Sequence, residues 1–253
     1  MEGACFFSIK KEHFSLSKLF EELDYRQTDL GELILRRRRM LGMKGVEIYE
    51  VMLAGDFLMS SLFHDSEVAL ADMALSELDA DGWEVVVGGL GLGYTAAAAL
   101  KFKEVKRLVV VEALGPVIEW HKADMVPNGR ILRDDNRLVF LQGDFFELAR
   151  TTGFDPDIPG YRFDAILLDI DHTPEDLLSA SHGDFYTPAG MQRIKSLIKP
   201  GGILAIWSND PPKKEFLALL SAVFDQAEGH GVSFDNPLLQ STSENGIYIA
   251  RCK

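Results

Sequence analysis

An apolar run that breaks into alternating glycines is the feature that most constrains this chain. Positions 85–87 are three valines, and glycines occupy positions 88, 89, 91 and 93. About twenty residues later a second valine run, 109–111, ends in Glu112. A buried strand, a tight turn, a helix and a second parallel strand would give this order. The pattern therefore predicts a doubly wound α/β sheet, with the glycine turn at the carboxyl end of a strand.

Acidic residues follow three successive predicted strands. Glu112 ends the second strand, Asp144 follows a strand at 137–141, and Asp169 follows one at 163–168. The carboxyl ends of parallel strands meet at one edge of the sheet, so we expect these acids to lie close together. Glycine lets the backbone approach a nucleoside, and a carboxylate after the second strand can accept hydrogen bonds from ribose hydroxyls. We predict a site for an adenosine-containing cofactor, contacted by Gly88, Gly89, Gly91, Gly93, Glu112, Asp144 and Phe145.

Composition narrows the class of protein. With 253 residues, 47% of them hydrophobic, the chain can bury a proper core. A net charge of −13 argues against a nucleic-acid partner and suits a small cationic substrate. We see no membrane-spanning run and no leader pattern at the start, and therefore expect a cytoplasmic protein without a membrane partner. The two cysteines, Cys5 and Cys252, have no spacing typical of a disulfide framework or a metal site, and we expect no metal.

The chain is expected to form two domains. Strands predicted at 31–36 and 46–53 indicate a small amino-terminal antiparallel β domain of residues 1–65, and a helix at 66–78 opens the second domain, 66–253. Four arginines, Arg36 to Arg39, lie in an extended segment and would point alternately to its two faces. We interpret them as a solvated sheet edge or a contact between subunits.

Strands and helices alternate from Trp83 onward. Helices are predicted at 95–101, 115–125, 188–198 and 212–224, a fifth strand at 202–207, and a surface loop at 152–160. The last two strands, at 228–234 and 246–251, are joined by a loop too short for a crossover helix and must pair antiparallel. A parallel sheet closed by an antiparallel pair resembles the class I methyltransferase architecture.

A dinucleotide-binding domain is the rival to this interpretation. Residues 91–96 fit a Gly-x-Gly-x-x-Ala pattern, and Glu112 would then hold the ribose of NAD. That alternative leaves Gly143-Asp144 unexplained and does not predict the closing antiparallel pair. We therefore favour a sulfonium nucleoside over NAD.

Several segments taken together resemble the spermidine synthase family. They are Val87-Gly88-Gly89, Val111-Glu112-Ala113, Gly143-Asp144, the turn Leu168 to Pro174, Phe185-Tyr186, and Leu197 to Leu204. The resemblance covers most of the chain from about Gly31. It implies an amino-terminal β-sheet domain before a methyltransferase-like domain, and a dimer built through the first of these. It also implies aminopropyl transfer from decarboxylated S-adenosylmethionine to a polyamine, releasing methylthioadenosine.

The same resemblance assigns the catalytic acids. Asp169 matches the family's first acid after the fourth strand, and is our candidate for the base and the amine anchor. Asp171 is the candidate second acid, although Asp-x-Asp-His-Thr-Pro replaces the family's Asp-x-x-Asp-Pro. His172 is either a general base or a polar turn residue. Trp207 and Asp210 are candidates for the acceptor side.

Two departures keep other functions open. Gly91 stands where the family has an aspartate near the aminopropyl ammonium, and residues 58–72 contain no Tyr-His pair. A small-molecule methyltransferase using intact S-adenosylmethionine is one alternative, since the missing aspartate would have repelled its carboxylate. A nucleoside-binding homologue without catalysis is the other. We expect surface roles for His64 and His182, and a packing role for Tyr186.

Overall fold

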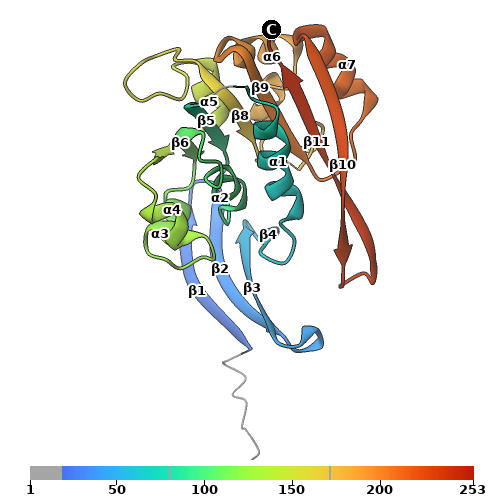
Figure 1. The fold of residues 1–253 in the computed structure, drawn as a ribbon. Helices are drawn as coiled ribbons and strands as arrows, with labels where there is room; N and C mark the ends of the chain where they lie inside the picture. The colour runs from blue at the N-terminus through green and yellow to red at the C-terminus, as the bar shows by residue number, and fades with distance from the viewer. Residues whose placement is uncertain (1–18, 80, 171) are drawn as a thin grey trace, which may run out of the picture. The chain divides into compact units, whose positions relative to one another are not determined.

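The computed structural model describes residues 19–79, 81–170 and 172–253. Cys5 and the predicted acid Asp171 lie outside the described residues. The chain forms two compact units, Met1–Leu58 and Met59–Lys253, and each unit has its own β-sheet (Figure 1). The predicted α/β class, with a small antiparallel sheet before the larger one, is confirmed.

The first unit is built on a four-stranded sheet in the order β1-β2-β3-β4. Its strands are β1 (Phe20–Thr28), β2 (Gly31–Met40), β3 (Val46–Leu53) and β4 (Asp56–Ser60), with a short 3-10 helix at Leu41–Met43. The two central strands are those predicted from the sequence. Strand β1 is mostly polar and β4 is only five residues long, so neither has a clear alternation of apolar and polar residues.

The four arginines lie on β2, an inner strand, so their interpretation as a sheet edge is wrong. They do alternate between faces, and their side chains pair with acids on the two neighbouring strands. Arg36 and Arg38 contact Glu50 at 2.7 and 2.5 Å, Arg37 contacts Glu21 at 2.6 Å, and Arg39 contacts Glu47 at 3.3 Å. Pairing across the sheet therefore explains this basic run.

The second unit is a seven-stranded sheet in the order β10-β11-β9-β8-β5-β6-β7 (Figure 1). Its strands are β5 (Trp83–Gly88), β6 (Val105–Glu112), β7 (Leu138–Gln142), β8 (Phe163–Leu168), β9 (Ile198–Ser208), β10 (Gln226–Asn236) and β11 (Ser241–Arg251). Strands β5 to β9 are parallel, and the β10–β11 hairpin joins β9 antiparallel, as predicted. The chain order reverses between β5 and β8, which is where open α/β sheets bind ligands.

Among the described residues, one α-helix precedes β5 and six follow it along the chain. They are α1 (Asp65–Ser76), α2 (Tyr94–Ala99), α3 (Gly115–Lys122), α4 (Gly129–Asp134), α5 (Phe145–Arg150), α6 (Pro188–Ser196) and α7 (Lys214–Val223), with a 3-10 helix at Ala180–Asp184. Helices α4 and α5 were not predicted, because each has only six residues, too few to show helical periodicity, and neither follows the glycine turn as the equally short α2 does. No helix in the described ranges is both long and apolar enough to cross a membrane.

The core of the second unit explains the valine runs. Residues 85–87 and 109–111 are fully buried, because inner strands of a covered parallel sheet have no exposed face. The segment 152–160 is a loop, but its expected place at the surface is only partly correct. Phe154 is fully buried and stacks on Phe145 with ring centroids 4.6 Å apart, and buried Asp155 pairs with Arg107 at 2.5 Å. An aromatic residue and an ion pair anchor this loop.

Candidate functional site

The glycine turn runs from the end of β5 into α2. Gly89, Gly91 and Gly93 have φ angles of +91°, +48° and +83°, which residues with a side chain rarely adopt. A Cβ atom on Gly93 would lie 2.7 Å from the ring of His121, and one on Gly88 would lie 2.5 Å from Phe145. The protein itself therefore fills the space beside these two glycines. Gly91 differs, because its neighbour is a flexible side chain: its Cβ would lie 2.7 Å from the Met59 sulfur.

Glu112 joins the end of β6 to the glycine turn. One carboxylate oxygen accepts the Leu90 N–H at 3.0 Å, and the other accepts the Leu114 N–H at 2.8 Å. Burial raises the pKa of Glu112, while hydrogen bonds from backbone amides act in the opposite direction. The N–H groups of Gly91 and Ala113 also act on this carboxylate. The structure thus brings Glu112 and the glycine turn together.

Asp144 and Phe145 have different roles at the start of α5. Asp144 caps this helix, since its Oδ1 accepts the N–H groups of Phe146 at 2.8 Å and Glu147 at 3.1 Å. Its side chain is exposed. The ring of Phe145, in contrast, is buried in the core. This ring packs on Gly88 and Phe154, and the contact of Phe145 with a cofactor stays a prediction.

Asp169 directly follows β8 and lies against the glycine turn. Its N–H donates to the Gly88 carbonyl at 2.8 Å, and its own carbonyl occupies the place that a Cβ on Gly89 would take. Its side chain faces α2, where the Thr95 hydroxyl lies 2.6 Å from Oδ2. The same hydroxyl is 3.2 Å from the Glu67 carbonyl oxygen, so Thr95 connects β8 with α1.

Glu67, in the first turn of α1, is the second acid at this point. Burial raises the pKa of Glu67 to about 8, and the negative charge of Asp169 raises it as well. Burial also raises the pKa of Asp169 to about 6, against the lowering effect of the Thr95 hydrogen bond. Near neutral pH the two groups therefore share one proton and one negative charge. Within the described residues, no lysine or arginine acts on either carboxyl.

Sequence reasoning did not find Glu67 or Thr95. Glu67 lies in the first turn of a predicted helix, where an acid usually caps the helix or faces solvent. Thr95 belongs to an alanine-rich helix, Tyr94–Ala99, and reads as a small packing residue. Their positions in the sequence could have identified them. Glu67 lies shortly before the first predicted strand of the sheet and Thr95 directly after the glycine turn, so both could have been expected near the strand ends.

A hydrogen-bond network supports Glu67 from the side of β9 and β11. The Ser66 hydroxyl lies 3.1 Å from Glu67 Oε2 and 3.0 Å from Asn245 Oδ1, and it accepts the Trp207 indole N–H at 2.9 Å. Trp207, predicted on the acceptor side, is thus linked to the acid pair through Ser66. Asp210 is placed differently, since its carboxylate pairs with Lys213 at 3.2 Å.

The three histidines named from the sequence lie in different surroundings. The rings of His64 and Tyr94 stack with centroids 4.1 Å apart, and those of His182 and Phe146 stack at 3.9 Å. Both histidines are partly exposed, and their expected surface roles stay a prediction. The backbone carbonyl of His172 accepts the N–H of Asn209 at 2.6 Å. Across the described part of the chain, no cluster of three or more His, Cys, Asp or Glu side chains could hold a metal.

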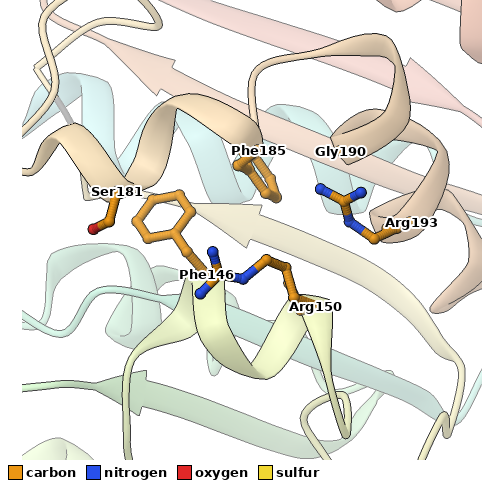
Figure 2. A pocket seen from close by; sticks show the side chains of 7 residues that line it. Phe146, Arg150, Ser181, Phe185, Gly190 and Arg193 are labelled. Atoms are coloured by element: carbon orange, nitrogen blue, oxygen red, sulfur yellow. The ribbon is translucent and has the colours of Figure 1, made fainter.

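A small hollow lies away from these acids, among α5, the 3-10 helix and α6. Its lining includes Phe146, Arg150, Phe185 and Arg193 (Figure 2). The ring of Tyr186, as expected, packs nearby against Phe185. The cavity volume is about 10 Å³, roughly the space for one water molecule. A nucleoside cannot occupy it, so the strand-end acids remain the candidate site.

The sheet order, the glycine turn and the strand-end acids define a methyltransferase-like α/β fold preceded by an antiparallel sheet. No protein-family model matches the sequence. The chain has a spermidine synthase-like fold. A spermidine synthase crystallised with the transition-state analogue AdoDATO has a TM-score of 0.70 and 17% identity over 92% of this chain and 74% of that one. Spermidine synthase from Thermotoga maritima has a TM-score of 0.66 and 17% identity over 92% and 73%.

Proposed function

We propose that this protein transfers an aminopropyl group from decarboxylated S-adenosylmethionine to a small amine. The observation that carries the proposal is the pair Glu67 and Asp169, two partly buried carboxyls next to the glycine turn that form no ion pair with a lysine or arginine among the described residues. An amine is positively charged at neutral pH, so it would complete this pair. The spermidine synthase-like fold supports the same assignment.

The adenosine part of the substrate fits the residues around the turn. We assign Glu112 to the ribose hydroxyls, because it follows the second strand of the sheet and contacts the glycine turn. Asp144 uses Oδ1 to cap α5, so we assign Oδ2 to the adenine amino group. Gly91, whose neighbour is the flexible Met59 side chain, lets the backbone approach the nucleoside.

The acid pair suits both ends of the reaction. At neutral pH Asp169 holds the negative charge and can take a proton from the attacking amine. Protonated Glu67 loses its proton readily when an ammonium group arrives, because a nearby positive charge favours the ionised carboxyl. Binding of a diamine should therefore release a proton.

The transfer step is a displacement at carbon. The lone pair of the deprotonated acceptor nitrogen attacks the aminopropyl carbon that is bonded to the sulfonium sulfur. A C–N bond forms as the C–S bond breaks, and the sulfur keeps the bonding electrons and leaves as part of methylthioadenosine. The proton removed from the nitrogen goes to Asp169.

One observation favours a second candidate, methyl transfer from intact S-adenosylmethionine. Gly91 has no side chain, and the neighbouring group is the thioether of Met59 rather than a carboxylate. Among the described residues, the atoms nearest to a Cβ at position 91 carry no charge that would repel the carboxylate of the intact cofactor. The acceptor could still be an amine held by the acid pair.

An assay with both cofactors separates these candidates. The purified protein is incubated with a diamine and either decarboxylated or intact S-adenosylmethionine, and methylthioadenosine and S-adenosylhomocysteine are measured. We expect methylthioadenosine from the decarboxylated form. Formation of S-adenosylhomocysteine alone would establish the methyltransferase candidate instead.

Asp169→Asn tests the assigned base. The variant should keep methylthioadenosine binding but lose transfer by at least about 100-fold, the lower range for a general base. Asp72→Asn, which replaces an exposed acid further along α1, is the control and should retain activity. If Asp169→Asn remains fully active, Asp169 is not the base.

A further inference from the structure

His121 contacts the glycine turn from the last turn of α3. The residue is fully buried, and its Nε2 lies 3.0 Å from the Gly91 carbonyl oxygen. A carbonyl only accepts hydrogen bonds, so the ring must carry its proton on Nε2. Asn128, just before α4, donates through Nδ2 to the Leu92 carbonyl at 2.9 Å. Two successive carbonyls of the turn are thus held by side chains that follow β6.

Holding these carbonyls fixes the conformation of the turn. A peptide unit is planar, so anchoring the Gly91 carbonyl also fixes the direction of the Leu92 N–H. Without these contacts the backbone at Gly91 and Gly93 could adopt many conformations, because neither residue has a Cβ. On the N–H side of the turn, Glu112 accepts from Leu90. Side chains from the β6–α4 region therefore hold the turn through both its N–H and its C=O groups.

Packing alone does not explain a histidine at this position. Its Nδ1 is buried and has no hydrogen-bond partner among the described residues, and an unpaired buried acceptor is destabilising. Leucine would fill the space without this penalty. Burial also lowers the pKa of His121 to about 4, so the ring is neutral and has a single N–H at neutral pH. The feature that leucine lacks is the Nε2 donor aimed at Gly91.

We infer that His121 is a positioning residue, which holds the Gly91 carbonyl so that the glycine turn is ready to bind a nucleoside. This inference rests on the proposed function, because it requires that the turn contacts the nucleoside. His121 acts through the backbone of Gly91 and would not itself take part in group transfer. Its neighbour Asn128 holds the next carbonyl in the same way.

A pair of variants isolates the donor from the packing. In His121→Gln the side-chain amide nitrogen can take the place of Nε2, whereas His121→Leu has similar bulk and no donor. We expect His121→Leu to weaken methylthioadenosine binding by about tenfold or more, and His121→Gln to stay within about threefold of the wild type, measured by calorimetry. In turnover the loss should be in KM for the nucleoside, with KM for the amine unchanged.

The two variants also separate the ways in which the inference can fail. Unchanged binding in His121→Leu, or equal losses in both variants, would overturn the positioning role while leaving the proposed function intact. Absence of nucleoside binding by the wild-type protein would overturn both. A third measurement needs no variant: long-range ¹⁵N–¹H correlation spectra of the wild type should show the Nε2–H tautomer, and an Nδ1–H tautomer would sink the inference.

Discussion

Buried acids are neutralised in different ways in the two sheets. In the first sheet, Glu50 is 2% exposed and lies between the guanidinium groups of Arg36 and Arg38. In the second, Glu67 and Asp169 are partly buried with hydroxyl groups and each other as neighbours. In the first sheet, the fold itself supplies the positive charge that neutralises the acid. In the second sheet, a proton shared by the two acids takes the place of a positively charged group.

This difference distinguishes a structural acid from a candidate functional one. A buried carboxylate needs a counter-charge or a proton, and a fold that needs only stability can supply the counter-charge itself. Acids held near a strand end with raised pKa values, and without an internal cation, are typical of sites that bind or move charge. The comparison can be tested by disturbing each type of acid separately.

The largest expected effect is at Glu50. Glu50→Gln keeps the shape of the side chain but leaves two arginines without a counter-charge. Because these arginines are only partly buried, we expect the free energy of unfolding to fall by about 2 to 3 kcal/mol, somewhat below the usual loss for a broken buried pair. Amide exchange at Leu35 and Val51 in a urea series would measure it. Glu47→Gln, a substitution of an exposed acid on the same strand, is the control, and an equal loss there would contradict the assignment.

A pH-dependent effect is expected at Glu67. Its folded-state pKa is raised, so its contribution is most favourable below the unfolded pKa and is lost as the pH rises toward about 8. Glu67→Gln removes this loss. The variant should therefore gain about 2 kcal/mol of stability over the wild type between about pH 5.5 and about pH 8.5.

Chemical denaturation at several pH values would follow this gain. Asp72→Asn serves as control, because Asp72 is an exposed acid on the same helix. A constant difference between Glu67→Gln and the wild type across this range would show that Glu67 titrates normally, and the contrast with Glu50 would disappear.

The smallest effect is expected at Arg37. Its partner Glu21 is 51% exposed, and ion pairs between exposed side chains contribute little. Arg37→Ala should change the free energy of unfolding by less than about 0.5 kcal/mol. A loss as large as that of Glu50→Gln, measured in the same urea series, would mean that the arginine run acts as one network.

The second sheet could be predicted from the sequence because its signals are local. The valine runs, the glycine turn and the short loop before the last strand each define one element by composition or length. Strand β1 was missed because it is mostly polar, and helix α5 because six residues are too few for periodicity. The four arginines were wrongly predicted to lie on a sheet edge. Their pairing with Glu50 depends on the order of the strands, which cannot be read from the arginines alone.

The candidate site was predictable only where residues follow strands. Glu112 and Asp169 were identified by their position after strands β6 and β8. Glu67, Thr95 and His121 were missed, because each acts from a helix whose packing brings it to the turn. Their roles depend on contacts over 28 to 74 residues of sequence, such as Thr95 with Glu67 and with Asp169.

The contact between Gly89 and the Asp169 carbonyl couples two distant parts of the gene. A side chain at position 89 would overlap that carbonyl and displace the loop that carries Asp169. A mutation at position 89 would therefore also change the position of Asp169, eighty residues away in the sequence. In descendants of this sequence we expect the glycine and the local path of the acid's backbone to be inherited together, even where the acceptor changes.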